Sequence, residues 1–396
     1  MKEIRIPRFR SEQFFSLFLI LFWGQDTVFN YIRAIILRIP YVNIGADYYF
    51  PIAIFVCFVL SLPYVVKAVS PKDLLFLLIS AIFYFLQTLL FPENREYLMS
   101  IAVNFFTVVL PLYIVGLRMD SEKHFKVLYI SSLVNICAFS LYTLFSSDSN
   151  DSHQVLYSGF MSRAYILLPQ LLVAIGYAFK KPNWINITIG IAGGVLLAMC
   201  GNRGSILLLV VFIMFCLFFF VGKKLRKSVY AVVSFVGVSI VLFYQWIVKA
   251  LGTLILVWGM SPRFLNYITS GGFFESEGRD SITQTLLDKI SEKPIIGYGL
   301  AANHVITESY AHNFVLELWT DFGIIAGSAL IGVVSCIIIK AWMKNKKDVL
   351  LCTLLCVGFF KLFISSSFLF EGMFFALLGY CVTLNRKGKL LTDRKG

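Results

Sequence analysis

The side chains best suited to chemistry in this sequence are one histidine and a small set of arginines. His312 lies where a polar segment meets a long apolar run, and the chain has only four histidines. An imidazole with an unperturbed pKa of about 6.5 removes protons well near neutral pH. We interpret His312 as a candidate general base; the alternative is an interfacial histidine whose ring only hydrogen bonds to a loop carbonyl.

Four arginines lie on the side of the membrane where basic residues are uncommon, according to the topology inferred below. A guanidinium group binds phosphate oxygens through two parallel hydrogen bonds and stays charged at any working pH. Several convergent arginines would therefore hold a diphosphate and stabilise it as a leaving group. The alternative is that each one reaches lipid phosphate at the membrane surface. The four residues are Arg163, Arg203, Arg263 and Arg279.

Two of these arginines are candidates for catalysis, and the other two are candidates for substrate binding. Arg203 lies in a tight turn between Gly201 and Gly204, and Arg279 precedes a helix expected over 281–292. The N-terminal N–H groups of such a helix favour an anion. We expect the apolar face of this helix to lie on the membrane or to pack across the helix bundle. That face consists of Ile282, Leu286, Leu287 and Ile290.

Polar residues on either side of His312 complete the candidate site. Tyr298, Asn313 and Glu317 are expected to bind substrate, and Glu317 shares a helix face with Asn313. A carboxylate inside a membrane span is costly and usually functional, so we expect Glu317 to orient a neighbour or to support the structure. The other histidines are His304, a weaker site candidate, and His124 and His153, both expected in solvated loops.

The elements that position these residues are predicted to be membrane helices. The chain of 396 residues is 58% hydrophobic with a mean hydropathy of +0.79, which excludes a soluble globular protein. A membrane span needs about 20 apolar residues. We predict an all-α polytopic bundle of about twelve spans, forming a single domain over residues 1–396. The expected spans are 13–32, 48–67, 73–91, 98–117, 126–146, 161–179, 184–201, 204–222, 228–249, 313–339, 348–365 and 367–384.

The distribution of charge predicts the topology. Most of the 35 basic residues fall in the N-terminal segment, in alternate loops and in the C-terminal segment. Basic residues resist translocation, so we place these segments and both termini in the cytoplasm. One large outer loop then covers residues 250–312. Gly323 and Gly327 share a stripe on the span that follows, which predicts close packing against another helix.

Composition also predicts which ligands are absent. The net charge of +13 reflects membrane topology, because no basic run shows the aromatic pattern of a nucleic-acid module. Cys352 and Cys356 share a helix face, but no further cysteine or histidine joins them, so we expect no metal site. No cofactor is expected either, since the sequence has no glycine-rich phosphate-binding loop. An Asp-x-Asp pair is also absent from the outer loops, which argues against a metal-dependent glycosyltransferase.

Several of these segments together resemble a known family. The run from Pro294 to Gly299 (PIIGYG), then His312-Asn313 and, after nine further residues, Gly323, resemble the signature of bacterial O-antigen polymerases and O-antigen ligases. The Arg203 turn and the Gly278-Arg279-Asp280 segment resemble the family's two outer-side arginine positions. The resemblance covers roughly residues 160–330. Ala326 departs from the ligase form of the motif, which usually has Gly, Thr or Tyr there.

The resemblance implies metal-independent glycosyl transfer at the outer face of the bacterial inner membrane. The donor would be a glycan on undecaprenyl diphosphate, with Arg203 and Arg279 on the diphosphate and His312 activating the acceptor hydroxyl. We expect a polymerase of O-antigen or capsular repeat units, with a chain-length regulator as a candidate partner. The first alternative is a ligase that transfers the glycan to lipid A-core. The second is a transporter or flippase of lipid-linked oligosaccharide, which charged residues in many spans would favour; most spans here carry few.

Overall fold

The structure is a computed structural model that describes residues 10–36, 46–145, 153–222 and 278–393, together with three isolated residues. Within these ranges every regular element is a helix, as predicted. The chain divides into two compact units, each assembled from separate stretches of sequence. The span expected at 228–249 and the candidate residue Arg263 lie outside the described residues. The expectation of a single domain stays a prediction.

The first unit contains residues 1–68, 120–205 and 221–269, and its described part consists of long helices. Helix α1 packs against α2 and α6, α6 packs against α7, and α7 packs against α8. Helix α7 begins at His153, so most of the segment between the spans expected at 126–146 and 161–179 is helical. The helices are α1 (Ser11–Ile36), α2 (Ala46–Val65), α6 (Ser121–Phe145), α7 (His153–Lys180) and α8 (Trp184–Met199).

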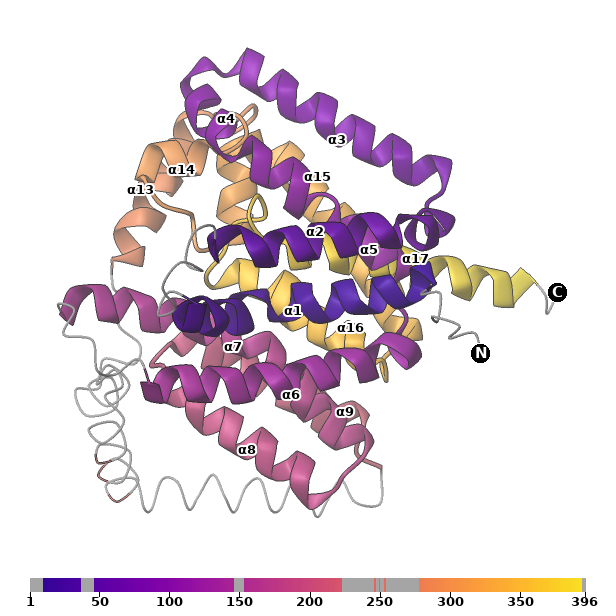
Figure 1. Cartoon of the computed structure of the whole chain (residues 1–396). Coiled ribbons are helices and arrows are strands. Elements are labelled where there is room, and N and C mark those ends of the chain that lie inside the picture. The colour runs from indigo at the N-terminus through magenta and orange to yellow at the C-terminus, as the bar shows by residue number, and fades with distance from the viewer. Residues whose placement is uncertain are drawn as a thin grey trace. The chain divides into compact units, whose positions relative to one another are not determined.

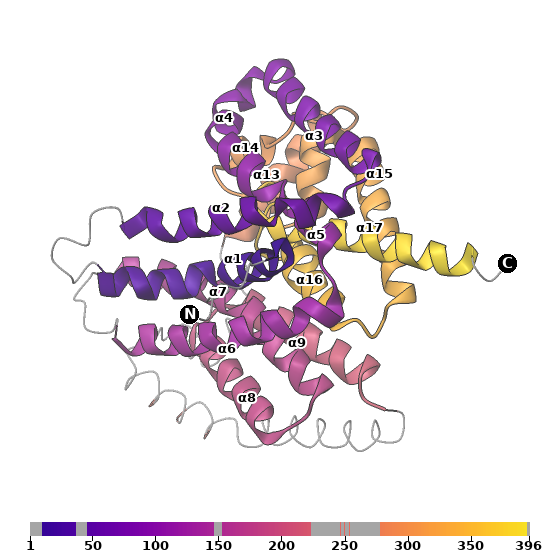
Figure 2. The same cartoon turned by 45° about the vertical axis from the view of Figure 1, so that its right-hand side comes forward.

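The second unit contains residues 69–119, 206–220 and 270–396. Its closest helix pair is α5 with α17, which both views show side by side (Figures 1 and 2). Helix α17 also packs against α15 and α16, and α13 packs against α15. The helices are α3 (Pro71–Leu90), α4 (Arg95–Asn104), α5 (Leu112–Arg118), α9 (Arg203–Phe219, whose first three residues belong to the first unit), α13 (Arg279–Glu292), α14 (Ala302–Thr307), α15 (Phe314–Lys344), α16 (Val349–Leu354) and α17 (Gly372–Asp393).

Short irregular helical segments join several of these helices. A π-helical segment, Phe105–Val109, follows α4, and a second one, Leu355–Phe359, follows α16 and leads into a 3₁₀ turn at Phe360–Phe363. Two further 3₁₀ turns, Val66–Ala68 and Pro92–Asn94, flank α3.

Six stretches of the described chain are long and apolar enough to cross a membrane, so the protein is a multi-pass membrane protein by this measure. Three shorter apolar helical segments accompany them: Trp184–Met199, Arg203–Phe219 and Val349–Phe363. The structure therefore supports the predicted class, but it does not confirm the count of about twelve. The six stretches are Pro51–Ala68, Pro71–Leu90, Pro92–Arg118, Ser121–Leu141, Ser162–Lys180 and Phe314–Lys344.

Polar residues at the helix starts explain where several helices begin. The Asn313 side chain accepts a hydrogen bond of 2.9 Å from the Val315 N–H and so caps α15. Asp348 caps α16 through the Leu351 N–H at 3.1 Å. Such caps satisfy N–H groups that have no partner within the helix, and each contributes about 1 kcal/mol.

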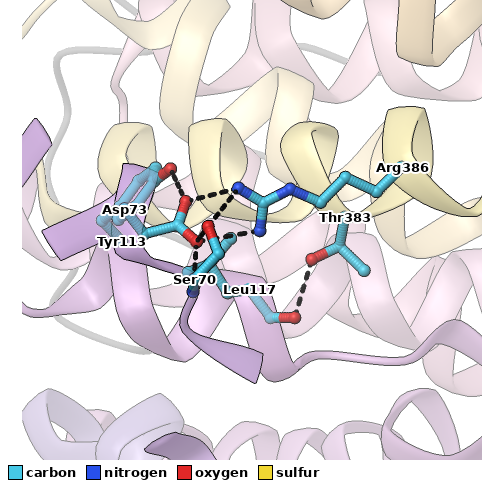
Figure 3. A network of polar contacts seen from close by, with 6 residues as sticks. All are labelled: Ser70, Asp73, Tyr113, Leu117, Thr383 and Arg386. Atoms are coloured by element: carbon cyan, nitrogen blue, oxygen red, sulfur yellow. Dashed lines mark hydrogen bonds and ion pairs between the residues drawn. The ribbon is translucent and has the colours of Figure 1, made fainter. Parts of the chain in front are cut away.

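A buried ion pair joins α3, α5 and α17 in the second unit (Figure 3). The Asp73 carboxylate, 2% exposed, accepts two hydrogen bonds of 2.8 Å from the Arg386 guanidinium. Tyr113 donates to the same carboxylate at 2.7 Å, and Ser70 donates through both its backbone N–H and its hydroxyl. This network ties the first turn of α3 to α5 and α17.

Candidate active site

The run from Pro294 to Gly299 folds against a break in helix α15. Gly323 has φ of +77° and ψ of 168°, which interrupts the helix one third of the way along. At the break the Ile324 N–H donates to the Pro294 carbonyl at 2.7 Å, and the Tyr298 N–H donates to the Thr320 carbonyl at 2.9 Å. The loop therefore supplies hydrogen bonds that a continuous helix would have made internally.

Glycine is required on both sides of this contact. Gly297 has φ of +72°, and a Cβ added there would lie 2.6 Å from the backbone N of Gly323. A Cβ on Gly323 would in turn collide with the carbonyl oxygen of Ile295. The prediction that Gly323 packs against another helix is therefore wrong, because its close neighbour is this loop. An apolar pattern does not distinguish a glycine that packs helices from one that breaks a helix.

Asp321 ties the same loop to helix α14. Its carboxylate is fully buried and accepts hydrogen bonds from the backbone N–H groups of Ala301 at 3.0 Å and Asn303 at 3.4 Å. The Asp321 carbonyl also accepts from the Gly299 N–H at 2.8 Å. Three residues of the signature run and the first turn of α14 are thus anchored to one turn of α15. The signature glycines act here as structural residues that hold the loop before His312.

Helix α13 packs its apolar face on the start of α15. Leu286 and Ile290 are buried in a cluster with Ala311 and Leu316, and Ile282 packs against its edge. This arrangement supports packing against the helices over the alternative of a helix that lies on the membrane. Leu287 is the exception among the four predicted residues, because its side chain is 42% exposed.

His312 lies in the loop between α14 and α15 with a strained backbone. Its φ of +52° is in the left-handed region that non-glycine residues seldom adopt. The ring packs against Tyr310, with centroids 4.0 Å apart and an angle of 44° between the planes. Its Nδ1 atom is buried and has no hydrogen-bond partner among the described residues. The backbone of Ile364 lies close enough to the ring to favour its protonated form.

The electrostatic environment keeps this histidine neutral. Burial of the ring and the positive charge of Arg279 lower the pKa of His312 to about 4, although the hydrogen bond to Ile364 opposes the shift. At neutral pH the ring is therefore neutral, and one of its two nitrogens keeps a lone pair that can accept a proton. Arg279 begins helix α13, after Gly278 with φ of +84°. His312 and Arg279 are thus predicted site residues that the structure brings together.

A serine-rich turn, residues 364–371, contacts Tyr310 before His312 and Glu317 after it. The sequence analysis did not predict this turn. The Ser365 hydroxyl lies 3.2 Å from the Tyr310 hydroxyl, and Ser367 donates to the carboxylate of Glu317. Glu317 is 1% exposed and accepts a further hydrogen bond from the backbone of Phe368. This supports the structural role predicted for Glu317. A run of three serines between two apolar segments was the available signal for this turn.

Tyr298 and Asn313 are both held by local contacts. The Tyr298 hydroxyl donates to Glu292 at 2.8 Å, and the Lys293 ammonium lies 4.4 Å from the centre of its ring. Burial and the Glu292 hydrogen bond raise the pKa of Tyr298 to about 12. The Asn313 side chain caps α15, and the Tyr298 hydroxyl is bonded to Glu292. Both residues therefore have a structural role, in addition to the substrate binding that the sequence predicts.

Two of the other histidines, His304 and His124, are buried. His304 is 7% exposed, stacks on Tyr97 with centroids 4.8 Å apart, and has a pKa lowered to about 4 by burial. His124 was expected in a solvated loop, but it is 2% exposed and its Nδ1 accepts a hydrogen bond from the Asp120 N–H at 2.9 Å. The prediction for His124 is wrong because a polar residue next to a loop also caps the helix that follows.

The two other candidate arginines that the structure describes, Arg163 and Arg203, belong to the first unit. Arg203 is the first residue of α9, directly after a turn in which Gly201 has φ of +70° and Asn202 accepts from the Ser205 N–H at 3.0 Å. This confirms the tight turn. Arg163 interacts electrostatically with Cys200, which precedes the same turn. Arg163 and Arg203 therefore share one region of the first unit, as His312 and Arg279 share one region of the second.

The fold and these residues define a multi-pass helical membrane protein, with a histidine in a loop that a broken helix anchors and an arginine at the start of a helix packed on the same broken helix. Residues 187–331 match the sequence model of a family described as O-antigen ligase, and the match supports membership of the O-antigen polymerase and ligase superfamily. The match therefore agrees with the family resemblance predicted from the sequence. The matched range contains Arg203, Arg279, His312 and the break at Gly323. No curated protein and no solved structure matches the chain significantly.

Proposed function

We propose that this protein polymerises oligosaccharide repeat units carried on undecaprenyl diphosphate, building an O-antigen or capsular polysaccharide. The observation that carries the proposal is the state of His312, which is neutral and presents a buried, unpaired Nδ1 beside Arg279. A neutral imidazole with a free lone pair accepts a proton, and an arginine next to it suits an anionic leaving group.

The chemistry assigns one role to each group. The acceptor hydroxyl of one repeat unit attacks the anomeric carbon of the glycan on the donor, and its proton passes to Nδ1 of His312. The bond between that carbon and the diphosphate oxygen breaks, and undecaprenyl diphosphate leaves with both electrons. Arg279 stabilises the charge that develops on the diphosphate, and one such contact supplies about 2.7–4 kcal/mol of transition-state stabilisation. The protein needs no metal for this reaction.

Substrate binding also tunes the base. In the free protein the charge of Arg279 contributes to the low pKa of His312. A bound diphosphate neutralises that charge, so the pKa of His312 rises toward the range where a general base works best. His312 is thus activated when the donor is in place. Arg203, with Arg163 and Arg263, is proposed to bind diphosphate on the strength of the sequence alone.

The proposed location is the bacterial inner membrane, with the reaction on its outer face, both termini in the cytoplasm and about twelve spans. Contacts within the second unit support this topology. Loops predicted on the outer side meet one another, as when Asn94 donates to the Tyr298 carbonyl at 2.9 Å. Segments predicted on the inner side also meet, as in the pair of Asp73 with Arg386. A chain-length regulator is proposed as a partner.

The alternative function is ligation of the glycan to lipid A-core, and the description of the matched family favours it. Both reactions use the same donor and the same proton transfer, so they differ only in the acceptor. The departure at Ala326 from the ligase form of the motif favours the polymerase.

Surface glycan length in a deletion strain tests the proposal. Complementation with the wild-type gene should restore a ladder of polymer, whereas His312→Ala should leave core that carries a single repeat unit. The control is Lys289→Gln, on an exposed face of α13. Bare core with long polymer on the lipid carrier would instead establish the ligase. An unchanged ladder, with the variant present in the membrane, would exclude His312 as the base.

A direct assay separates the two enzymes. The purified protein is incubated with a purified lipid-linked repeat unit and no lipid A-core. A polymerase lengthens the chain, whereas a ligase leaves the substrate unchanged.

A further inference from the structure

An apolar groove lies between the C-terminal half of α15 and α17, at the opposite end of α15 from His312. It has a volume of about 680 Å³ and is open along one side. Gly332, Val333 and Cys336 line its wall on α15, and Asn385 of α17 lies on the other side. No residue of the proposed catalytic machinery reaches it: Lys340 follows Phe314 by 26 residues, which is roughly 39 Å of helix rise before the break at Gly323 is considered.

The shape of the groove comes from a missing side chain and from a bridge between the helices. A Cβ added to Gly332 would meet nothing within 4 Å, so this glycine leaves open space beside Val333, which is 58% exposed. The Asn385 side chain donates to the Ile337 carbonyl at 3.1 Å and holds α17 against α15. The result is an apolar groove, held on one side by the Asn385 hydrogen bond, whose volume can hold a hydrocarbon chain.

Two lysines line the end of this groove. Lys340 and Lys344 are one helical turn apart, so both ammonium groups project from the same face of α15. Both residues are exposed, and no carboxylate among the described residues pairs with either of them. An apolar groove that ends in two ammonium groups is complementary to an amphiphile with a chain and a phosphate.

We propose that this groove binds one anionic phospholipid of the bilayer. An acyl chain lies along Gly332, Val333 and Cys336, and the phosphate contacts Lys340 and Lys344. Basic residues near a membrane attract anionic lipids, and the groove adds a binding site for the acyl chain. The basic segment after residue 339 is cytoplasmic in the predicted topology, so the lipid belongs to the inner leaflet. The proposal does not depend on the proposed enzymatic activity.

Native mass spectrometry of the full-length protein tests this proposal with phosphatidylglycerol as the probe and phosphatidylcholine as the neutral comparison. The wild type should retain one phosphatidylglycerol and should not retain phosphatidylcholine. The variant K340Q/K344Q should bind it about tenfold more weakly, because two favourable phosphate contacts are lost. The matched control is K346Q/K347Q, which removes two exposed lysines of the turn after α15 that do not line the groove.

A second variant tests the groove and leaves the charge unchanged. Gly332→Leu fills the open space and should also displace phosphatidylglycerol, with both lysines in place. An equal loss in K346Q/K347Q would overturn the proposal in favour of general surface attraction. Equal retention of phosphatidylcholine, or no retention of either lipid by the wild type, would overturn it as well.

Cysteine reactivity gives a readout on the unmodified chain. Cys336 lines the groove and is exposed, and Cys137 is exposed elsewhere. Phosphatidylglycerol should slow the reaction of Cys336 with a maleimide and leave that of Cys137 unchanged. Equal rates at Cys336 in phosphatidylglycerol and phosphatidylcholine would contradict the proposal, even if a variant failed to fold.

Discussion

Gly297 and Gly323 approach each other so closely that a side chain on Gly297 would lie 2.6 Å from the backbone N of Gly323. Both residues have positive φ, +72° and +77°, which is favourable only for glycine. The loop that precedes His312 is therefore built on two glycines that are 26 positions apart in the sequence. Their role is to let the backbone of the loop pack directly against the backbone of α15 at its break.

Alanine at either glycine should disrupt this contact. Gly323→Ala and Gly297→Ala each add a methyl group against backbone atoms that cannot move independently. We expect each to cost about 1–3 kcal/mol from the backbone strain at a positive φ, in addition to the steric clash. Glycan polymerisation should be lost or strongly reduced, and the apparent Tm in detergent should fall.

The matched control for this prediction is Gly332→Ala on the same helix. Its Cβ meets nothing within 4 Å, so the substitution should leave stability and activity unchanged or slightly raise stability. If Gly323→Ala behaved like Gly332→Ala, the break in α15 would not be required.

The ion pair of Asp73 and Arg386 should contribute to stability independently of the reaction. Asp73→Asn and Arg386→Gln each leave a buried or half-buried partner without its counter-charge. The loss from breaking a buried pair is about 3–5 kcal/mol, and we expect the lower end because the Arg386 side chain is 38% exposed. Thermal unfolding in detergent measures the effect.

A double-mutant cycle separates the pair from its surroundings. If the two residues act through each other, the double variant should be destabilised by much less than the sum of the single variants. Additive losses would mean that Asp73 acts mainly through Tyr113 and Ser70, which also bond to it.

The helices were predictable because a membrane span needs an apolar run of sufficient length. Eleven of the twelve expected ranges coincide with helical segments of the described chain, and α13 begins within two residues of its predicted start. The break at Gly323 was not predictable, because apolar patterning is the same in a straight and in a broken helix. The positive φ angles depend on long-range backbone contacts that the sequence shows only as glycines.

Part of the candidate site was also predictable from the contrast between polar residues and apolar runs. His312 and Arg279 stood out because polar residues near apolar runs are rare and few residues act as bases. Ile364 was missed, since a contact made by a backbone group leaves no mark in the residue type. Ser365 was missed although the run of three serines at 365–367 was a signal for a polar turn. Tyr310 was missed because an aromatic residue at a membrane surface is the ordinary case.

Tyr310 and Ser365 should act as positioning residues for His312. Tyr310 packs on the imidazole and its hydroxyl lies 3.2 Å from the Ser365 hydroxyl, beside the residue whose backbone bonds to the ring. Tyr310→Phe and Ser365→Ala each remove one hydrogen bond, worth about 1 kcal/mol, so we expect kcat to fall about fivefold. KM for the lipid-linked repeat unit should stay the same.

The double variant distinguishes a positioning role from two separate effects. If the hydroxyl pair works as one unit, Tyr310→Phe with Ser365→Ala should be no slower than either single variant. A rise in KM at constant kcat would show instead that these residues bind substrate.

Replacing Arg279 should move the pH dependence of the reaction as well as its rate. The positive charge of Arg279 contributes to lowering the pKa of His312 to about 4, so its removal raises that pKa. The base is lost when the pH falls through its pKa, and kcat/KM reports the free enzyme. The acid limb of kcat/KM should therefore move to higher pH in Arg279→Gln.

At neutral pH kcat should fall by about 10²–10³ because the leaving diphosphate loses a charge contact. Lys289→Gln removes a charge from the exposed face of the same helix and should change neither quantity. A slower Arg279→Gln with an unmoved acid limb would show that Arg279 acts on the diphosphate alone and that His312 is not the titrating base.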